Sequence, residues 1–255
     1  MKLPANMLKS LLKEGKPAFG IFLTIGHAEV AEMMSLVGFD WLLIDMEHAP
    51  IDAATLEVMA MAVKPPVTPL VRVPVNDPAY IKVALDAGVM GVMVPHVDNA
   101  EEAKQAASYV RYPPKGTRGV GPRRAALYGL AREEYMKIAA EDVMLIVQIE
   151  SREAVENAEE ILSVEGVDAY FIGPADLSAS LGVTGGLRNS EIVRAVERVA
   201  SVGEAQGVPG GIYCASRSDL KLALRLGLRM LALGSDYRIL VEGAKGRLEE
   251  AKSLI

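Results

Sequence analysis

The chain has 255 residues, of which 51% are hydrophobic and 24% are charged, and its formal net charge is −6. An acidic balance argues against nucleic acid as the main partner. No apolar run reaches the roughly 18 residues of a membrane-spanning helix. The start lacks the apolar core of a signal peptide, and the one cysteine, Cys214, cannot form an internal disulfide. We therefore expect a cytoplasmic protein that interacts with neither nucleic acid nor membranes.

Apolar runs with the length of buried strands alternate with amphipathic segments along the whole chain. Such nearly continuous apolar runs are typical of parallel strands that helices cover on both faces. Glycines such as Gly38, Gly88 and Gly166 follow the helical segments, as left-handed helix ends favour. The predicted strands cover residues 18–25, 40–47, 68–74, 91–96, 143–150, 168–176, 208–214 and 228–236. The predicted helices cover residues 28–37, 53–62, 78–87, 100–109, 152–162, 191–206, 218–226 and 238–253.

Eight strand–helix units match the number that closes a (β/α)8, or TIM, barrel. We predict a single α/β domain over residues 1–255, with right-handed crossovers that place all strand carboxyl ends on one face. An open doubly wound sheet is the competing architecture, but no glycine-rich dinucleotide turn follows the first strand. Gly210-Gly211 and Gly234-Ser235 stand at the usual phosphate site of barrels, unless these glycines only make turns.

The connection over residues 111–129 is rich in Pro, Gly and Arg. Long loops in compact domains usually have a function, and we expect this loop to pass over the active face. Its four arginines favour a place near an anionic substrate or at a subunit contact. A plain surface insertion is the alternative.

Two predicted strands end in an acidic residue, Glu150 and Asp176. A buried carboxylate is costly unless it is paired or bound to a metal. In a barrel both would meet in one pocket, where an all-oxygen site suits Mg²⁺ or Mn²⁺. A structural salt bridge to Arg72 is one alternative. A zinc site built from the three histidines is another.

Further polar side chains stand at the ends of other strands. Asp45 and His48 predict a dyad in which the carboxylate orients the imidazole, with Glu47 as an alternative partner. Arg72 lies inside an apolar strand and needs an anionic partner, either a substrate oxygen or a core ion pair. Because no predicted strand contains a lysine for a Schiff base, carbonyl chemistry here would use a metal as Lewis acid.

Six segments in a fixed order carry a resemblance to a known family. They are LLIDMEHAPID (42–52), VRVP (71–74), ALDAG…VMVP (84–95), RYPPKGTRGVGP (111–122), VQIESREAVEN (147–157) and GVDAYFIGPADLSASLG (166–182). Together they resemble the HpcH/HpaI aldolase/citrate lyase family, and in particular its class II, pyruvate-dependent aldolases. The resemblance implies a lyase of aromatic or sugar-acid catabolism. Such an enzyme reversibly cleaves a 4-hydroxy-2-keto acid into pyruvate and an aldehyde through a metal-stabilised enolate.

The resemblance also implies how the site binds its ligands. Glu150 and Asp176 would hold Mg²⁺, Mn²⁺ or Co²⁺, which pyruvate would chelate. Gln148 would line the site together with the segment Gly173-Pro174-Ala175, whose end would offer backbone N–H groups to the pyruvate carboxylate.

The remaining implied roles concern proton transfer and assembly. Arg72 would stabilise the enolate oxygen, and His48, oriented by Asp45, would relay the proton. Asp86 would reach the site of a neighbouring subunit in a hexamer whose last helix, residues 238–253, is exchanged between subunits. Two alternatives stay open: a lyase of the malyl-CoA or citramalyl-CoA type, and a non-catalytic barrel that binds keto acids.

Overall fold

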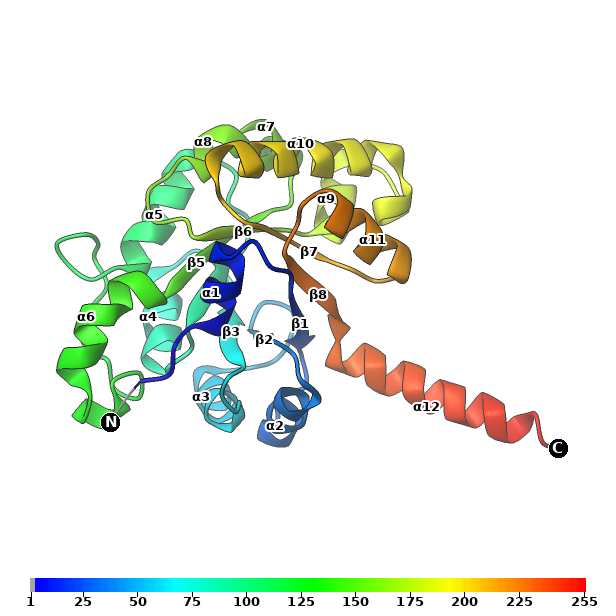
Figure 1. Cartoon of the computed structure of the whole chain (residues 1–255), viewed down its shortest axis with the longest axis horizontal. Coiled ribbons are helices and arrows are strands. Elements are labelled where there is room, and N and C mark those ends of the chain that lie inside the picture. Colours follow the sequence, from blue (N-terminus) through cyan, green and yellow to red (C-terminus); the bar gives the residue numbers. More distant parts are fainter. Residues whose placement is uncertain (1–2) are drawn as a thin grey trace.

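The computed structural model describes residues 3–255 and contains a closed barrel of eight strands in chain order (Figure 1). Every neighbouring pair of strands is parallel. The predicted (β/α)8 barrel is therefore confirmed. The strands are β1 (Ala18–Leu23), β2 (Trp41–Asp45), β3 (Thr68–Arg72), β4 (Gly91–Val94), β5 (Met144–Ile149), β6 (Ala169–Ile172), β7 (Gly210–Tyr213) and β8 (Met230–Ser235).

Helices cover the outside of the barrel, and most begin at a residue whose side chain accepts a backbone N–H of the first turn. Asp52, Asp77, Asn99 and Ser151 act in this way, and Asp77 is followed by Pro78 at the first helical position. The helices are α1 (Met7–Lys13), α2 (Ala28–Val37), α3 (Ala53–Ala62), α4 (Pro78–Asp86), α5 (Ala100–Val110), α6 (Arg132–Asp142), α7 (Arg152–Glu156), α8 (Ala158–Leu162), α9 (Pro174–Leu181), α10 (Ser190–Gln206), α11 (Arg217–Arg225) and α12 (Asp236–Lys252). Two short 3₁₀ turns are η1 (Leu127–Gly129) and η2 (Gly186–Arg188).

The short helix α1 closes the amino-terminal end of the barrel. Its Leu8 and Leu12 join the cluster of apolar side chains that fills the barrel interior, which includes Trp41 and Met144. The amide of Asn6, just before the helix, donates to the carbonyls of Met90 and Asp142. The sequence had not predicted this helix, because seven residues are too few to show a clear helical period.

The structure differs from the prediction in further places. β6 ends at Ile172 rather than at 176, because Gly173-Pro174 begins helix α9 directly after it. The predicted helix over residues 152–162 is divided at Asn157 into α7 and α8. Helix α6 was not predicted, and it lies between the loop 111–129 and β5.

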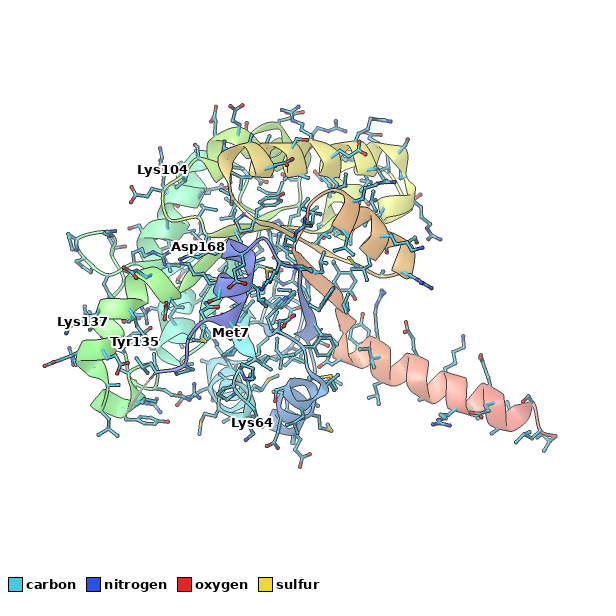
Figure 2. The ribbon with its side chains drawn as sticks, in the orientation of Figure 1. Met7, Lys64, Lys104, Tyr135, Lys137 and Asp168 are labelled. Atoms are coloured by element: carbon cyan, nitrogen blue, oxygen red, sulfur yellow. The ribbon has the colours of Figure 1, made fainter. Side chains whose placement is uncertain are left out.

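The loop 111–129 lies against the amino-terminal face of the barrel, so the expectation that it passes over the active face is wrong. Arg111 donates to the carbonyl of Val143, just before β5, and pairs with Asp168, just before β6, at 2.7 Å. Asp168 also pairs with Lys9 of α1, and Figure 2 shows it beside that helix. Arg111, Arg118 and Arg124 therefore hold strand starts and helix ends, since polar groups of the chain itself supply their acceptors.

Helix α12 leaves the barrel after β8 and extends away from it, as Figure 1 shows in red. Apolar side chains along it are exposed, among them Leu240 at 64% and Val241 at 61%. Exposed apolar side chains also gather on α2 and α3, namely Met33, Leu36, Val37, Val58 and Met61. Among the helices of residues 3–255, none combines the length and the apolar character that crossing a membrane requires.

Candidate active site

The carboxyl ends of β2, β3 and β5 bring four polar side chains together. Asp45 and Arg72 are the last residues of β2 and β3, and they are paired in the register of the two strands. Gln148 is next to last in β5, and Glu150 follows that strand directly. All four residues are buried, which is costly for charged and amide groups unless they are hydrogen-bonded.

Arg72 forms the centre of this group. Its Nε and Nη2 donate to the two carboxylate oxygens of Asp45 at 3.0 and 2.7 Å, a bidentate arrangement. Its guanidinium carbon also lies 5.2 Å from the ring centre of Phe22. Burial by itself would lower the pKa of Arg72, but the hydrogen bond and charge of Asp45, with the charge of Glu47, raise it above its ordinary value. Arg72 is therefore a permanent cation at the floor of the site.

Glu150 is held by two donors. The Nε2 of Gln148 donates to Oε2 at 2.6 Å, and the backbone N–H of His96 donates to Oε1 at 2.9 Å. His96 has a φ of 52°, a left-handed conformation that few residues other than glycine adopt. Burial raises the pKa of Glu150 against the lowering effect of the hydrogen bond from His96. A bound cation would stabilise this buried carboxylate in its charged form.

Glu47 is a site residue that the sequence suggested only as a substitute for Asp45. Its Oε2 lies 2.9 Å from Nη1 of Arg72, and its Oε1 lies 3.5 Å from Nε2 of His96. The contact with Arg72 is close, but its geometry is not that of a hydrogen bond. Oε2 of Glu47 therefore has no hydrogen-bond partner among the described residues. Burial raises the pKa of Glu47, although Arg72 acts in the opposite direction. Its position two residues after Asp45, on the same side of the chain, was the sequence feature that could have identified it.

The predicted side-chain pair of Asp45 and His48 is absent. Asp45 accepts the backbone N–H of His48, at 3.3 Å, and its remaining capacity is used by Arg72 and the N–H of Glu47. The imidazole Nε2 of His48 lies instead 3.8 Å from Oε2 of Glu47. His48 lines the pocket and its side chain is 60% exposed. Asp45 thus positions the backbone of His48, and Glu47 is the carboxylate nearest to its ring.

The first turn of α9 forms another wall of the pocket, beside Glu150. Gly173 is the N-cap residue without a capping side chain, Pro174 occupies the first helical position, and Asp176 lies in the first turn. A Cβ at Gly173 would stand 2.7 Å from Oε2 of Glu150, so only glycine permits this close approach. The pocket is lined by Gly173, Pro174, Ala175 and Asp176. The N–H groups that begin a helix are suited to bind a carboxylate.

The donor set fits a hard divalent cation held by few protein ligands. Glu150 and Asp176 are close enough for the charge of Asp176 to contribute to the raised pKa of Glu150. Within residues 3–255, no three His, Cys, Asp or Glu side chains converge on one point. Mg²⁺ and similar ions usually bind through one or two carboxylates and complete their coordination with water and substrate oxygens. The zinc alternative finds no support, since His27 is exposed and caps α2.

Asp86 lies outside this pocket. It is the last residue of α4, and its Oδ1 lies 2.6 Å from Nη2 of the buried Arg118. The carboxyl end of a barrel helix lies at the amino-terminal face of the strands, opposite the site. Burial raises the pKa of Asp86 against the effect of Arg118. Within one chain, Asp86 therefore cannot contact the substrate pocket.

Comparison with known proteins places this arrangement in a family. The model of the HpcH/HpaI aldolase/citrate lyase family matches residues 18–242. The chain belongs to this family. A 4-hydroxy-2-oxo-heptane-1,7-dioate aldolase from Salmonella typhimurium is 41% identical over 242 residues, which are 94% of this chain and 92% of the relative.

Solved structures agree with this assignment. A HpcH/HpaI aldolase/citrate lyase family protein from Burkholderia cenocepacia superimposes with a TM-score of 0.92 at 36% identity, covering 97% of this chain and 99% of its own. The citrate synthase SbnG superimposes with a TM-score of 0.88 at 29% identity, covering 97% and 98% of the two chains. Aldolases of the family typically depend on a divalent metal. The chain is accordingly an aldolase of the carbon–carbon lyase class.

Proposed function

We propose that this aldolase reversibly cleaves the C3–C4 bond of a 4-hydroxy-2-keto acid to give pyruvate and an aldehyde, and that it requires Mg²⁺, Mn²⁺ or Co²⁺. The observation that carries the proposal is the buried cation Arg72, joined through Gln148 to the buried carboxylate of Glu150, which lies against Gly173 at the uncapped start of α9. An anionic keto acid would find complementary groups at each of its oxygens there.

The metal would be held by Glu150 and Asp176, and it would supply Lewis-acid polarisation of the keto group. The α9 segment Gly173-Pro174-Ala175 and the amide of Gln148 bind and orient the pyruvate half of the substrate. The guanidinium of Arg72 stabilises the negative charge that develops on the C2 oxygen as the enolate forms.

His48 moves the proton. In cleavage it accepts the proton of the C4 hydroxyl, the electrons of the C3–C4 bond move to form the enolate, and the aldehyde is released. A proton then returns to C3 to give pyruvate. Glu47, 3.8 Å from Nε2 of His48, stabilises the imidazolium that forms in the first step, and Asp45 positions the backbone of His48.

The name of the curated relative suggests the first substrate to test. Cleavage of 4-hydroxy-2-oxoheptane-1,7-dioate between C3 and C4 gives pyruvate and 4-oxobutanoate. The relatives favour this aldolase function over a CoA-ester lyase and over a non-catalytic keto-acid-binding barrel.

The proposal is tested by metal removal and by one substitution at the metal pair. Pyruvate released from 4-hydroxy-2-oxoheptane-1,7-dioate is measured by coupling to lactate dehydrogenase, after EDTA treatment and after each metal is restored. We expect EDTA treatment and Glu150→Gln each to lower kcat/KM about a thousandfold or more. Glu14→Gln, whose side chain is exposed at the other end of the barrel, is the matched control. Full activity in EDTA, or in Glu150→Gln, would contradict the proposal.

We also propose that the chain, a single domain, assembles into a homo-oligomer, a hexamer, with α12 exchanged between subunits. The exposed apolar side chains of α12 and those of α2 and α3 support this, since exposed patches of this kind usually mark contacts between proteins. In such an assembly Asp86 would reach a neighbouring site. Light scattering should show an oligomer for the full chain and a smaller species after removal of residues 244–255. A monomeric full chain would refute the assembly.

A further inference from the structure

The pocket is much larger than pyruvate requires. Its volume is about 1320 Å³, and it continues from the polar group of β2, β3 and β5 toward the carboxyl ends of β7 and β8. The aldehyde half of the substrate must occupy this second part. The residues that line it should therefore decide which aldehyde the protein accepts.

Aromatic rings connect the two parts of the pocket. The guanidinium of Arg72 lies 5.2 Å from the centre of the Phe22 ring. That ring in turn lies 5.7 Å from the ring of Tyr213, edge to face, and 5.8 Å from the ring of Phe171. A chain of apolar carbon atoms would pack well on this floor as it runs from the pyruvate end toward Tyr213.

Ser235 lies beside Phe22 in the register of β1 and β8, and its hydroxyl is unused. It is the N-cap residue of α12, yet its side chain makes no capping hydrogen bond. The residue is 4% exposed, lines the pocket, and its Oγ has no hydrogen-bond partner among the described residues. A buried hydroxyl without a partner is uncommon. A ligand acceptor in the pocket would provide the missing partner.

Asp236, the neighbouring acid, does not use this hydroxyl. Its carboxylate accepts the N–H groups of Thr24, Ile25 and Tyr237 and the hydroxyl of Thr24. Four donors therefore satisfy its charge within the protein. Asp236 therefore needs no hydrogen bond from the hydroxyl of Ser235.

Tyr213 and Arg238 add two further donors to the part of the pocket that Ser235 lines. The Tyr213 hydroxyl would lie 3.9 Å from a Cβ at Gly234, the residue before Ser235. Arg238 lines the pocket from the first turn of α12, and its Nε lies 3.4 Å from the hydroxyl of Tyr237. The hydrogen bond with Tyr237 is the main cause of a raised pKa of Arg238, and the nearby Tyr213 is the second cause. No ion pair of Arg238 with an acid is found within residues 3–255.

We propose that Tyr213, Ser235 and Arg238 form a subsite for the carboxylate of an anionic aldehyde, and that this subsite makes the protein selective for keto diacids. The inference rests on the proposed aldolase function. The two hydroxyls and the guanidinium can donate hydrogen bonds to carboxylate oxygens, and the guanidinium also supplies one positive charge for the one negative charge of a carboxylate. An uncharged aldehyde would leave Ser235 unpaired and gain nothing from Arg238.

Two other charged side chains line the same part of the pocket. Arg188, in η2, is exposed and offers a competing cation. Asp219, in the first turn of α11, adds a negative charge that disfavours a doubly charged phosphate more than a carboxylate. The experiment therefore compares Arg238 with Arg188, and it compares a carboxylate-bearing aldehyde with a phosphate-bearing one.

The test measures aldol addition of pyruvate to two aldehydes of equal length, 4-oxobutanoate and butanal. We expect Arg238→Ala to lower kcat/KM for 4-oxobutanoate roughly tenfold to hundredfold, mainly through KM, and to leave butanal within about threefold. Ser235→Ala and Tyr213→Phe should shift the same ratio more weakly, and Arg238→Lys should restore part of it. Because Ser235→Ala removes a hydroxyl without a partner, its stability should equal or exceed that of the wild type.

Other outcomes would overturn the inference. One is an unchanged ratio in Arg238→Ala, another is an equal fall in Arg188→Ala, and a third is a stronger dependence on Arg238 for glyceraldehyde 3-phosphate than for 4-oxobutanoate. If the wild type converts neither aldehyde, the proposed function fails, and calorimetric titration with 4-oxobutanoate alone then decides the subsite. Weaker binding by Arg238→Ala supports it, and equal binding refutes it.

Discussion

Removal of the Arg72 side chain should destabilise the protein strongly, and the structure indicates by how much. Arg72→Leu takes away both hydrogen bonds to Asp45, at 3.0 and 2.7 Å, and the 2.9 Å contact with Glu47. Asp45 is only 2% exposed, so water cannot replace the lost partner. Breaking a buried ion pair by removing one side costs about 3–5 kcal/mol. We expect the free energy of unfolding to fall by about this amount.

The double variant Asp45→Asn/Arg72→Leu separates the charge from the packing. Asparagine keeps the oxygen that accepts the N–H groups of Glu47 and His48, but it carries no charge. The double variant should therefore be more stable than Arg72→Leu alone. Arg123→Leu is the control, because Arg123 forms an exposed pair with Glu57 at a similar 2.9 Å, and its loss should cost less than about 1 kcal/mol.

Urea unfolding followed by the fluorescence of the single tryptophan, Trp41, measures all four proteins. Trp41 is fully buried in β2, so its emission reports global unfolding. The reasoning would be refuted if Arg72→Leu lost no more stability than Arg123→Leu. It would also be refuted if the double variant were less stable than Arg72→Leu.

Three further predictions test other parts of the structure. His48→Ala should lower kcat for pyruvate release about a hundredfold or more, whereas His27→Ala should leave it unchanged, because His27 is exposed at the start of α2; equal losses would remove the proton-transfer role. Burial raises the pKa of Cys214 to about 12, so the thiolate fraction at pH 8 is small. The reaction of Cys214 with Ellman's reagent should therefore be about a thousandfold slower in folded than in urea-unfolded protein. Rapid reaction of the folded protein would contradict the burial. Gly20→Ala should destabilise the protein by about 1–3 kcal/mol or more, since the added Cβ would overlap the ring of Trp41 in the barrel interior, and a midpoint equal to that of the wild type in urea would show that the ring can move.

The barrel was predictable from the sequence because each unit carries its own local information. Apolar runs long enough for a buried strand, glycines after helices and caps such as Asp77-Pro78 act within a few residues of one another. Helix α1 escaped prediction because its contacts, such as those of Asn6 with Met90 and Asp142, join residues far apart in the chain. Its short apolar pattern alone does not indicate a helix.

The difference between local and long-range information also explains which parts of the site could be predicted. Strand ends identified Asp45, Arg72 and Glu150 as neighbours, since parallel strands in a barrel bring their ends together. Which acid pairs with which base depends on geometry that the sequence does not contain. Asp45 uses its oxygens for Arg72, so the nearest carboxylate to the ring of His48 is Glu47. Likewise, the arginines of residues 111–129 were expected near an anionic substrate or at a subunit contact, but Arg111 and Arg118 pair with Asp168 and Asp86 of the same chain.

The ion pairs of the amino-terminal face have a consequence for how this protein can change. Lys9, Arg111 and Asp168 join α1, the loop 111–129 and β6 at the end of the barrel away from the pocket. Tyr213 and Arg238, by contrast, contribute from the pocket end, where few such pairs depend on them. Laboratory evolution toward new aldehyde acceptors should therefore tolerate substitutions at Tyr213 and Arg238. Libraries that vary the residues of the opposite face should yield mostly unfolded variants.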